Sequence, residues 1–157
     1  MNAMTILRRC RAAENEIGQI QQRIDRRREI LDGLSAPAAD PNGGSRGGGD
    51  PDKIGRVMAE VDEMEREIAA RREAWMAEKA ASLALTEMIP DTEGKVLYDY
   101  YVLRLDTPEI ARKEKYVAGY VRKVKRSGEQ LLAMISPARV KSVLPEWYIR
   151  EKGDGEP

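Results

Sequence analysis

Apolar residues return every seven positions near the start of the chain. Over residues 3–32 they fall in two neighbouring rows, in which Arg27 is the one clear polar interruption. One row holds Ala3, Cys10, Ile17, Ile24 and Leu31, and the other holds Ile6, Ala13, Ile20, Arg27 and Leu34. Two such rows form a narrow apolar seam along a helix, as in coiled coils. The pattern therefore predicts a first coiled-coil helix within residues 1–34.

The same spacing in residues 52–89 predicts a second coiled-coil helix. Asp50 or Asp52 can cap its start, and Pro90 ends it because proline cannot continue a helix. Its two rows are Ile54, Val61, Ile68, Trp75, Ser82 and Ile89, and Val57, Met64, Arg71, Glu78 and Leu85. Between the helices, residues 35–51 are rich in glycine and proline, which predicts a flexible linker rather than an ordered glycine-rich binding loop.

The two long helices are expected to fold back on each other as an antiparallel coiled-coil hairpin. If Leu34 faces Ile54 across the linker, the numbers of facing residues add up to about 88. The pairs that follow are Ile24 with Met64, Ile20 with Ile68, and Ala13 with Trp75. From residue 77 the second helix is apolar on more than one side, which predicts that this end packs into a C-terminal unit.

Shorter helices are expected in residues 90–135. In "TEGKVLYDYYVLRLD" the apolar spacing predicts a helix from about Thr92, with a strand as the alternative because of the β-branched and aromatic residues. In "DTPEIARKE", Asp106 or Thr107 can cap a helix of about two turns that ends before Tyr116. A further helix follows in "AGYVRKVKRSGEQLLAMI". Two short helices joined by a turn, the second of them basic, describe a helix-turn-helix.

The spacing separates buried from outward positions in this helix-turn-helix. Ile110, Val121 and Val124 are the expected buried anchors, and the small Ala111 lets the second helix cross closely. The rest of the inner side is expected to come from Leu131 and Leu132, with Met134 or Ile135. Small residues at the N-terminal end of the second helix let the backbone approach base edges, and basic residues further along meet phosphates. The outward positions, predicted to bind DNA, are Ala118, Gly119, Tyr120, Arg122, Lys123, Lys125 and Arg126.

Charge adds to this picture only through its distribution. The chain has 27 Lys and Arg against 27 Asp and Glu, so its net charge is zero. Residues 112–126, in contrast, hold seven basic residues and one acidic residue. Charged helix faces are common, so a solvated face of a purely structural bundle is the competing interpretation. The "RRR" at 26–28 is itself interpreted as a solvated face, because Asp25 and Glu29 stand beside it.

The residue types present argue against an enzyme. There is no histidine and a single cysteine, Cys10, so the commonest general base is missing and a zinc site cannot be built. No glycine-rich phosphate motif stands between a strand and a helix. We therefore expect no catalytic residue, cofactor or metal. The lone cysteine fits a reducing, cytoplasmic setting, and we expect neither a signal peptide nor a membrane span.

A resemblance to a known family appears in "DTPEIARKEKYVAGYVRKVKRSGEQLL", residues 106–132. This stretch resembles region 4 of bacterial sigma factors and their phage relatives, with Glu109-Ile110-Ala111 as the hallmark triplet and Val121 ten residues after the alanine. From the first helix to about Leu132, including "DKIGRVMAEVDEMEREI", the layout resembles small phage transcription regulators of the RinA-like and ArpU-like group.

The chain departs from the family pattern at the turn of the helix-turn-helix. The family pattern has an apolar residue three positions after the alanine and a glycine one position later. Here these positions hold Glu114 and Lys115. Val117 stands where a small polar cap usually begins the second helix. The geometry of the turn is therefore an open point for the structure.

The resemblance implies a phage or prophage DNA-binding regulator of transcription, acting as an activator or accessory factor in the cytoplasm of the bacterial host cell. Double-stranded DNA is the implied partner, and host RNA polymerase is a second one because region-4-like modules can also contact it. The hairpin would form a homodimer that places two recognition helices on neighbouring half-sites. The alternative functions are a phage structural or DNA-packaging subunit of the small-terminase type and a protein-binding adaptor.

The predicted fold is all-α: a long antiparallel coiled-coil hairpin followed by a small sigma region-4-like helix-turn-helix domain in residues 90–135. The tail, residues 136–157, lies outside the resemblance, and two of its prolines, Pro137 and Pro145, are expected to break it into short pieces. Trp147 and Tyr148 are expected to pack on the body of the protein, with a partner-binding peptide as the alternative.

Overall fold

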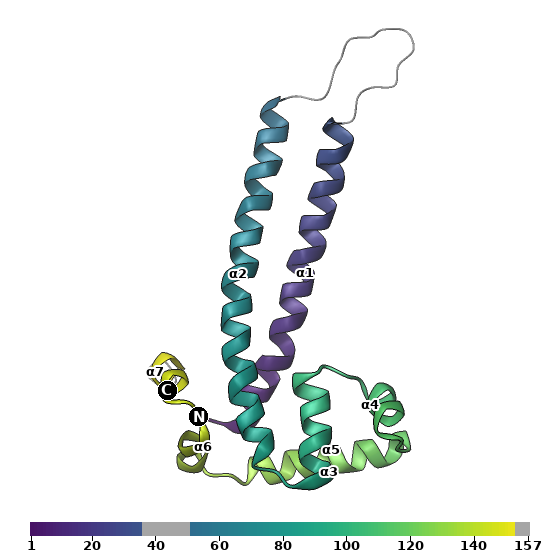
Figure 1. The fold of residues 1–157 in the computed structure, drawn as a ribbon, viewed down its shortest axis with the longest axis vertical. Coiled ribbons are helices and arrows are strands. Elements are labelled where there is room, and N and C mark those ends of the chain that lie inside the picture. Colours follow the sequence, from purple (N-terminus) through teal and green to yellow (C-terminus); the bar gives the residue numbers. More distant parts are fainter. Residues whose placement is uncertain (36–50, 153–157) are drawn as a thin grey trace. The chain divides into compact units, whose positions relative to one another are not determined.

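The computed structural model describes residues 1–35 and 51–152, and within these ranges every regular element is helical (Figure 1). The elements are α1 (Ala3–Ser35), α2 (Pro51–Glu87), α3 (Asp91–Leu97), the π-helix η1 (Tyr98–Val102), α4 (Thr107–Glu114), α5 (Ala118–Ala133), α6 (Pro137–Val143) and α7 (Glu146–Lys152). The all-α prediction is therefore confirmed, and the strand considered for residues 92–106 does not form. The predicted flexible linker, residues 35–51, lies outside the described residues except at its ends.

The chain divides into two compact units. Residues Met1–Glu14 and Ala74–Pro157 form one of them, called the globular unit below, and residues Asn15–Glu73 form the other, called the hairpin unit. The division cuts through both long helices. The first turns of α1 and the last turns of α2 therefore belong with the short helices and not with the rest of the hairpin.

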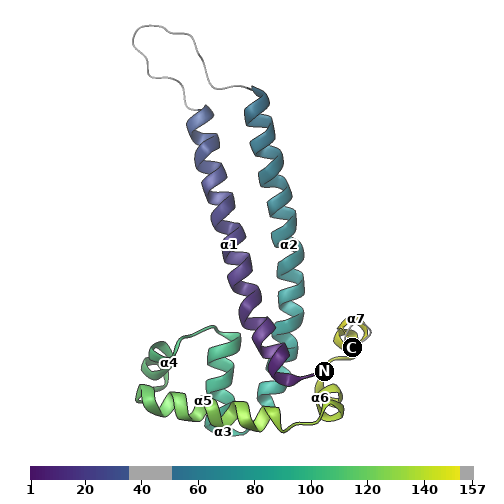
Figure 2. The same cartoon turned by 180° about the vertical axis from the view of Figure 1, so that it is seen from behind.

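Within the hairpin unit, α1 and α2 lie side by side in both views (Figures 1 and 2). Cross-helix ion pairs show that they run antiparallel: Arg27 with Glu60 at 2.9 Å, Arg28 with Glu65, and Arg71 with Glu16. The numbers of these paired residues add up to values from 87 to 93, near the predicted sum of about 88. Exposed pairs contribute only about 0.2–1 kcal/mol each, so the buried seam carries most of the stability. Its buried members are Ile17, Ile20, Ile24, Val61 and Ile68.

The polar seam positions of the hairpin unit have partners on the facing helix. Arg27, which interrupts the apolar row of α1, pairs with Glu60 of α2. Arg71, which interrupts the row of α2, pairs with Glu16 of α1 and with Glu67 one turn away. Each arginine can lay its aliphatic stem along the seam while its guanidinium reaches a carboxylate at the edge.

A single core joins both ends of the chain in the globular unit. Its buried members are Ala3, Met4, Ile6, Leu7, Ala77, Ala81, Leu85, Ile89, Leu97, Tyr101, Leu132, Val140, Leu144 and Tyr148. The apolar end of α2, beyond residue 77, is thus buried against the short helices, as its all-round apolar pattern indicated. The tail aromatics differ from each other, since Tyr148 is fully buried whereas Trp147 is 50% exposed.

Glu78 is a buried charge in this core, and the tail supplies its hydrogen bond. The hydroxyl of Tyr148 donates to Glu78 Oε2 at 2.6 Å. Arg9 Nε lies 3.6 Å and Lys152 Nζ lies 3.9 Å from the other carboxylate oxygen. Burial and the neighbouring carboxylate raise the pKa of Tyr148, so the phenol keeps the proton that it donates. The tail therefore completes the core as well as covering it.

Candidate nucleic-acid interface

A small second core holds α3, α4 and α5 together. Val96, Ile110, Val121 and Val124 are its buried members. The three predicted anchors of the helix-turn-helix are thus buried together, with Val96 of α3 as a fourth member. The half-buried Ala111, Tyr100, Leu105 and Tyr116 pack around them. For the rest of the inner side the prediction was only partly right. Leu132 is buried and Ile135 packs on the core that Leu132 belongs to, whereas Leu131 and Met134 are 39% and 81% exposed.

Helix α4 begins with a reciprocal cap. The backbone N–H of Glu109 donates to Asp106 Oδ1 at 2.8 Å, and the N–H of Asp106 donates to Glu109 Oε1 at 3.3 Å. Pro108 occupies the first turn, where its missing N–H costs nothing. The glutamate of the Glu-Ile-Ala triplet therefore acts as a capping residue, and the isoleucine acts as a core residue.

The turn between α4 and α5 forms in spite of its unusual residues. Lys115 takes up the left-handed backbone conformation, with φ 59° and ψ 44°, that glycine usually supplies at the end of a helix. The N–H groups of Lys115 and Tyr116 both donate to the carbonyl of Ala111. These two bonds satisfy the end of α4 and direct the chain into α5.

Glu114 stands where the family pattern has an apolar residue, and its largely covered side chain pairs with the exposed Lys95. Its carboxylate lies 2.6 Å from Lys95 Nζ and 3.5 Å from Lys113 Nζ. The hydrogen bond from Lys95 lowers the pKa of Glu114, so the carboxylate stays ionised. Nearby, Lys113 Nζ donates to the buried Asp99, whose pKa is raised by burial. This cluster connects α3, η1 and α4 and engages two of the basic residues of the region.

The outward surface of α5 carries most of the residues that were predicted to bind DNA. Gly119, Arg122, Lys123 and Arg126 are exposed, and Tyr120 is 46% exposed. Ala118 is half-buried in the first turn. A helix repeats every 3.6 residues, so the buried positions 121, 124, 128 and 132 line one side and leave the other side to solvent.

Lys125 is an exception, because it does not lie on the outward surface. Its side chain is only 23% exposed, and its ammonium lies 2.8 Å from the carboxylate of Glu129. The same nitrogen lies 4.2 Å from the centre of the Tyr100 ring, against which Arg11 also stacks at 3.8 Å. The reason is helical phase, since Lys125 is one turn beyond the buried Val121 and shares its side of the helix.

Val117 is the surface residue of this region that the sequence patterns missed. It occupies the N-cap position of α5, its side chain is 77% exposed, and no side-chain capping bond forms there. The sequence pattern identified it only as a missing polar cap. Its exposure next to Tyr120 could not be foreseen, because the start of a helix has no periodic pattern of its own.

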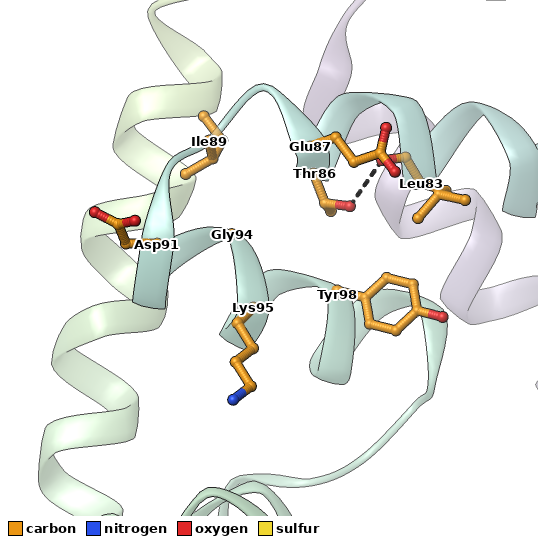
Figure 3. Close-up of a pocket in the computed structure, with 8 residues that line it drawn as sticks. All are labelled: Leu83, Thr86, Glu87, Ile89, Asp91, Gly94, Lys95 and Tyr98. Carbon is orange, nitrogen blue, oxygen red and sulfur yellow. Dashed lines mark hydrogen bonds between the residues drawn. The ribbon is translucent and has the colours of Figure 1, made fainter.

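A hollow lies at the junction of α2 and α3 in the globular unit. It has a volume of about 290 Å³ and is lined by Leu83, Thr86, Glu87, Ile89, Asp91, Gly94, Lys95 and Tyr98. Figure 3 shows the Thr86 hydroxyl turned to the backbone of its own helix, where it donates to the Leu83 carbonyl at 3.0 Å, and Lys95 extending away from the hollow. Its polar side chains do not converge on one point, so we assign it no ligand.

Residues 1–35 and 51–152 contain no cluster of three or more Cys, Asp or Glu side chains that could hold a metal. Cys10 is buried, and burial raises the pKa of its thiol, so it is a core residue and not an activated nucleophile. No helix in the described part of the chain is both long and apolar enough to cross a membrane.

Comparison with known proteins yields no match. No protein-family model matches the chain, and no curated protein and no solved structure does so either. The resemblance to sigma region 4 and to small phage regulators therefore rests on the residues named above. The function has to be argued from the surface and the packing of α4 and α5.

Proposed function

We propose that this protein is a phage or prophage regulator of transcription that binds double-stranded DNA through the outward surface of α5. The observation that carries the proposal is a group of three exposed basic residues on one side of α5. Lys95, Lys113 and Lys125 pair with carboxylates of the chain itself. Arg122, Lys123 and Arg126 are exposed and take part in no ion pair within the described residues. Three cations on one helix surface are available to neutralise phosphates.

The packing of α4 and α5 supports the same function. Ile110, Val121 and Val124 share one core, which holds α5 against α4. This packing supports the proposal that α5 is the second helix of a helix-turn-helix. In such motifs the N-terminal end of the second helix meets base edges in the major groove, and the flanking residues meet the backbone. Ala118 and Gly119 are small enough for close approach at that end, and the cations follow in the next two turns.

The test is a DNA-binding titration with a variant in which Arg122, Lys123 and Arg126 are all changed to glutamine. We expect the variant to bind a duplex about 100-fold more weakly than the wild type, because three phosphate contacts are lost. The slope of log affinity against log salt should become shallower by about three, close to one for each lost contact. Fluorescence anisotropy at several salt concentrations measures both quantities.

A matched control carries the same change of charge on the hairpin unit, where Arg23, Arg26 and Arg66 are also exposed. Changing these three to glutamine should leave the affinity within about twofold of the wild type, because none of them contacts DNA under the proposal. Circular dichroism confirms that both variants are folded. Equal binding by the wild type and the α5 variant would refute the proposal. An equal loss of affinity in both variants would also contradict it, because binding would then depend on the total charge of the chain and not on the surface of α5.

The hairpin unit is proposed to act as a coiled-coil dimerisation element for this regulator. Ile30 and Met58 support this proposal, because they are 44% and 53% exposed on helices whose other apolar residues are mostly covered. A dimer would present two α5 helices to half-sites about 34–36 Å apart, from which an activator could also contact host RNA polymerase. We expect sedimentation equilibrium to give twice the chain mass; a monomer at micromolar concentration would exclude the dimer, and a large ring would favour a packaging subunit.

A further inference from the structure

At two positions at the start of α5, the residue present makes the helix less stable than a common alternative would. The first is Val117, which stands at the N-cap, where serine, threonine, aspartate or asparagine would accept a backbone hydrogen bond. Its side chain forms no such bond and is 77% exposed, so it neither caps the helix nor packs into the core. The globular unit therefore gains nothing from a valine at this point.

The second position is Gly119, two residues later. Glycine destabilises a helix relative to alanine, and it is usually kept where space or backbone conformation requires it. At Gly94 an added Cβ would lie 2.2 Å from the Ile89 carbonyl oxygen, and at Gly128 it would lie 2.9 Å from Leu97 Cδ1. At Gly119 it would meet nothing within 4 Å, and the backbone is helical. Packing within the described chain therefore gives no reason for this glycine.

Tyr120 is a third exposed residue at the start of α5. It is 46% exposed, and its ring is held edge-on against Tyr116, with 5.1 Å between the ring centres. Val117, Gly119 and Tyr120 are thus three exposed residues without charge at the start of α5, and Arg122 and Lys123 follow after the buried Val121. The cations favour a polyanion as the occupant of the surface, and the apolar side chains favour an apolar group on that polyanion.

The 5-methyl group of thymine is the apolar feature that base pairs present in the major groove. Residues 117–120 contain no amide, carboxylate or guanidinium side chain that could form the usual bidentate bonds to a base. Departures from local stability are expected where a residue serves a ligand and not the fold. We propose, on the basis of the DNA-binding function proposed above, that Val117 and Tyr120 recognise thymine through its methyl group while Gly119 lets the backbone of α5 come close to the bases.

The experiment uses a duplex that the full chain selects from a randomised pool. Each thymine in this duplex is replaced in turn by deoxyuridine, which removes only the methyl group. At contacted positions the affinity should fall about fourfold for each methyl removed. In the Val117→Ser variant, replacing thymine by deoxyuridine should no longer change the affinity at one of these positions, because the valine side chain that contacts the methyl group is absent.

Measuring the melting temperature together with the DNA affinity shows whether Val117 and Gly119 serve binding or the stability of the fold. Val117→Ser and Gly119→Ala should each raise the melting temperature by about 2 °C, yet Gly119→Ala should weaken binding about tenfold, the effect of losing one base contact. Gly55→Ala is the matched control, because a Cβ there also meets nothing within 4 Å; it should raise the melting temperature and leave the affinity unchanged. Tolerance of uracil at every position, or full affinity in Gly119→Ala, overturns this inference alone. Failure of the wild type to bind any duplex overturns the proposed function as well.

Discussion

Replacing Tyr148 by alanine is expected to lower the free energy of unfolding of the chain by about 3–5 kcal/mol, the range for deleting a large and fully buried aromatic side chain. Tyr148 is 0% exposed and lies in the core shared by both ends of the chain. The replacement also removes the hydrogen bond to Glu78, which is itself only 5% exposed. The lost packing and the unsatisfied carboxylate act in the same direction. Urea denaturation followed by circular dichroism measures the change.

The neighbouring Trp147 is a matched control for this prediction. It is also an aromatic residue of α7, but half of its side chain is exposed. Trp147→Ala should therefore cost less than about 1 kcal/mol, as expected of a surface substitution. Tyr148→Phe isolates the hydrogen bond and should cost about 1.5–3 kcal/mol, because the lost acceptor is charged. Equal effects of the two alanine replacements would contradict the burial of Tyr148.

Tyr148 is buried and the adjacent Trp147 is half exposed, and the sequence pattern could not predict this difference. The prolines at 137 and 145 correctly indicated a tail of short pieces, which the structure contains as α6 and α7. Which aromatic is buried depends on Glu78, a partner 70 residues earlier in the chain. The spacing within the tail carries no information on such a partner. For the same reason Glu78 appeared in the sequence pattern only as one member of a seam row of the second helix.

In the candidate interface, too, some positions could be predicted from the sequence and others could not. Ile110, Val121 and Val124 could be predicted as buried, because Val121 and Val124 have the spacing of one side of α5 and because Ile110 lies on α4, which is close to α5 in sequence. Lys125 was wrongly placed on the outward surface. Its position is decided by Tyr100 and Glu129, and the charge of a lysine gives no indication of which carboxylate it meets. A charged residue beside a buried position is therefore the least predictable element of such a surface.

The turn shows a third limit, which concerns backbone conformation. The family pattern calls for glycine where this chain has Lys115, and the departure placed the turn in doubt. The structure forms the turn with lysine in the left-handed conformation, at a cost of about 1–2 kcal/mol relative to an ordinary helical residue. The two backbone bonds to the Ala111 carbonyl and the Lys95–Glu114 pair offset this cost. Lysine in place of glycine therefore raises the energy of the turn, and the chain still passes from α4 into α5.

Among glycine-to-alanine replacements in the globular unit, Gly94→Ala should have the largest effect. We expect it to lower the free energy of unfolding by about 3 kcal/mol. An added Cβ would lie 2.2 Å from the Ile89 carbonyl oxygen and 2.9 Å from the Thr86 carbonyl oxygen. Both are backbone atoms, so no rotation of a side chain relieves the overlap, and α3 has to move away from the end of α2. Thermal and urea unfolding measure the loss. Gly55→Ala is the control and should instead gain about 0.5–1 kcal/mol, the difference in helix propensity.

A shift of α3 is also expected to reach the candidate interface. Helix α3 contributes Val96 to the core under α5, pairs Lys95 with Glu114 at the turn, and packs Leu97 on Gly128 of α5. Under the proposed function, the Gly94→Ala variant should therefore lose DNA affinity at temperatures where it is still folded, even though Gly94 itself is buried. Unchanged stability would contradict the close contact of α3 with the end of α2. Lost stability with unchanged affinity would show that α5 keeps its orientation without α3, so that α4 alone suffices to hold it.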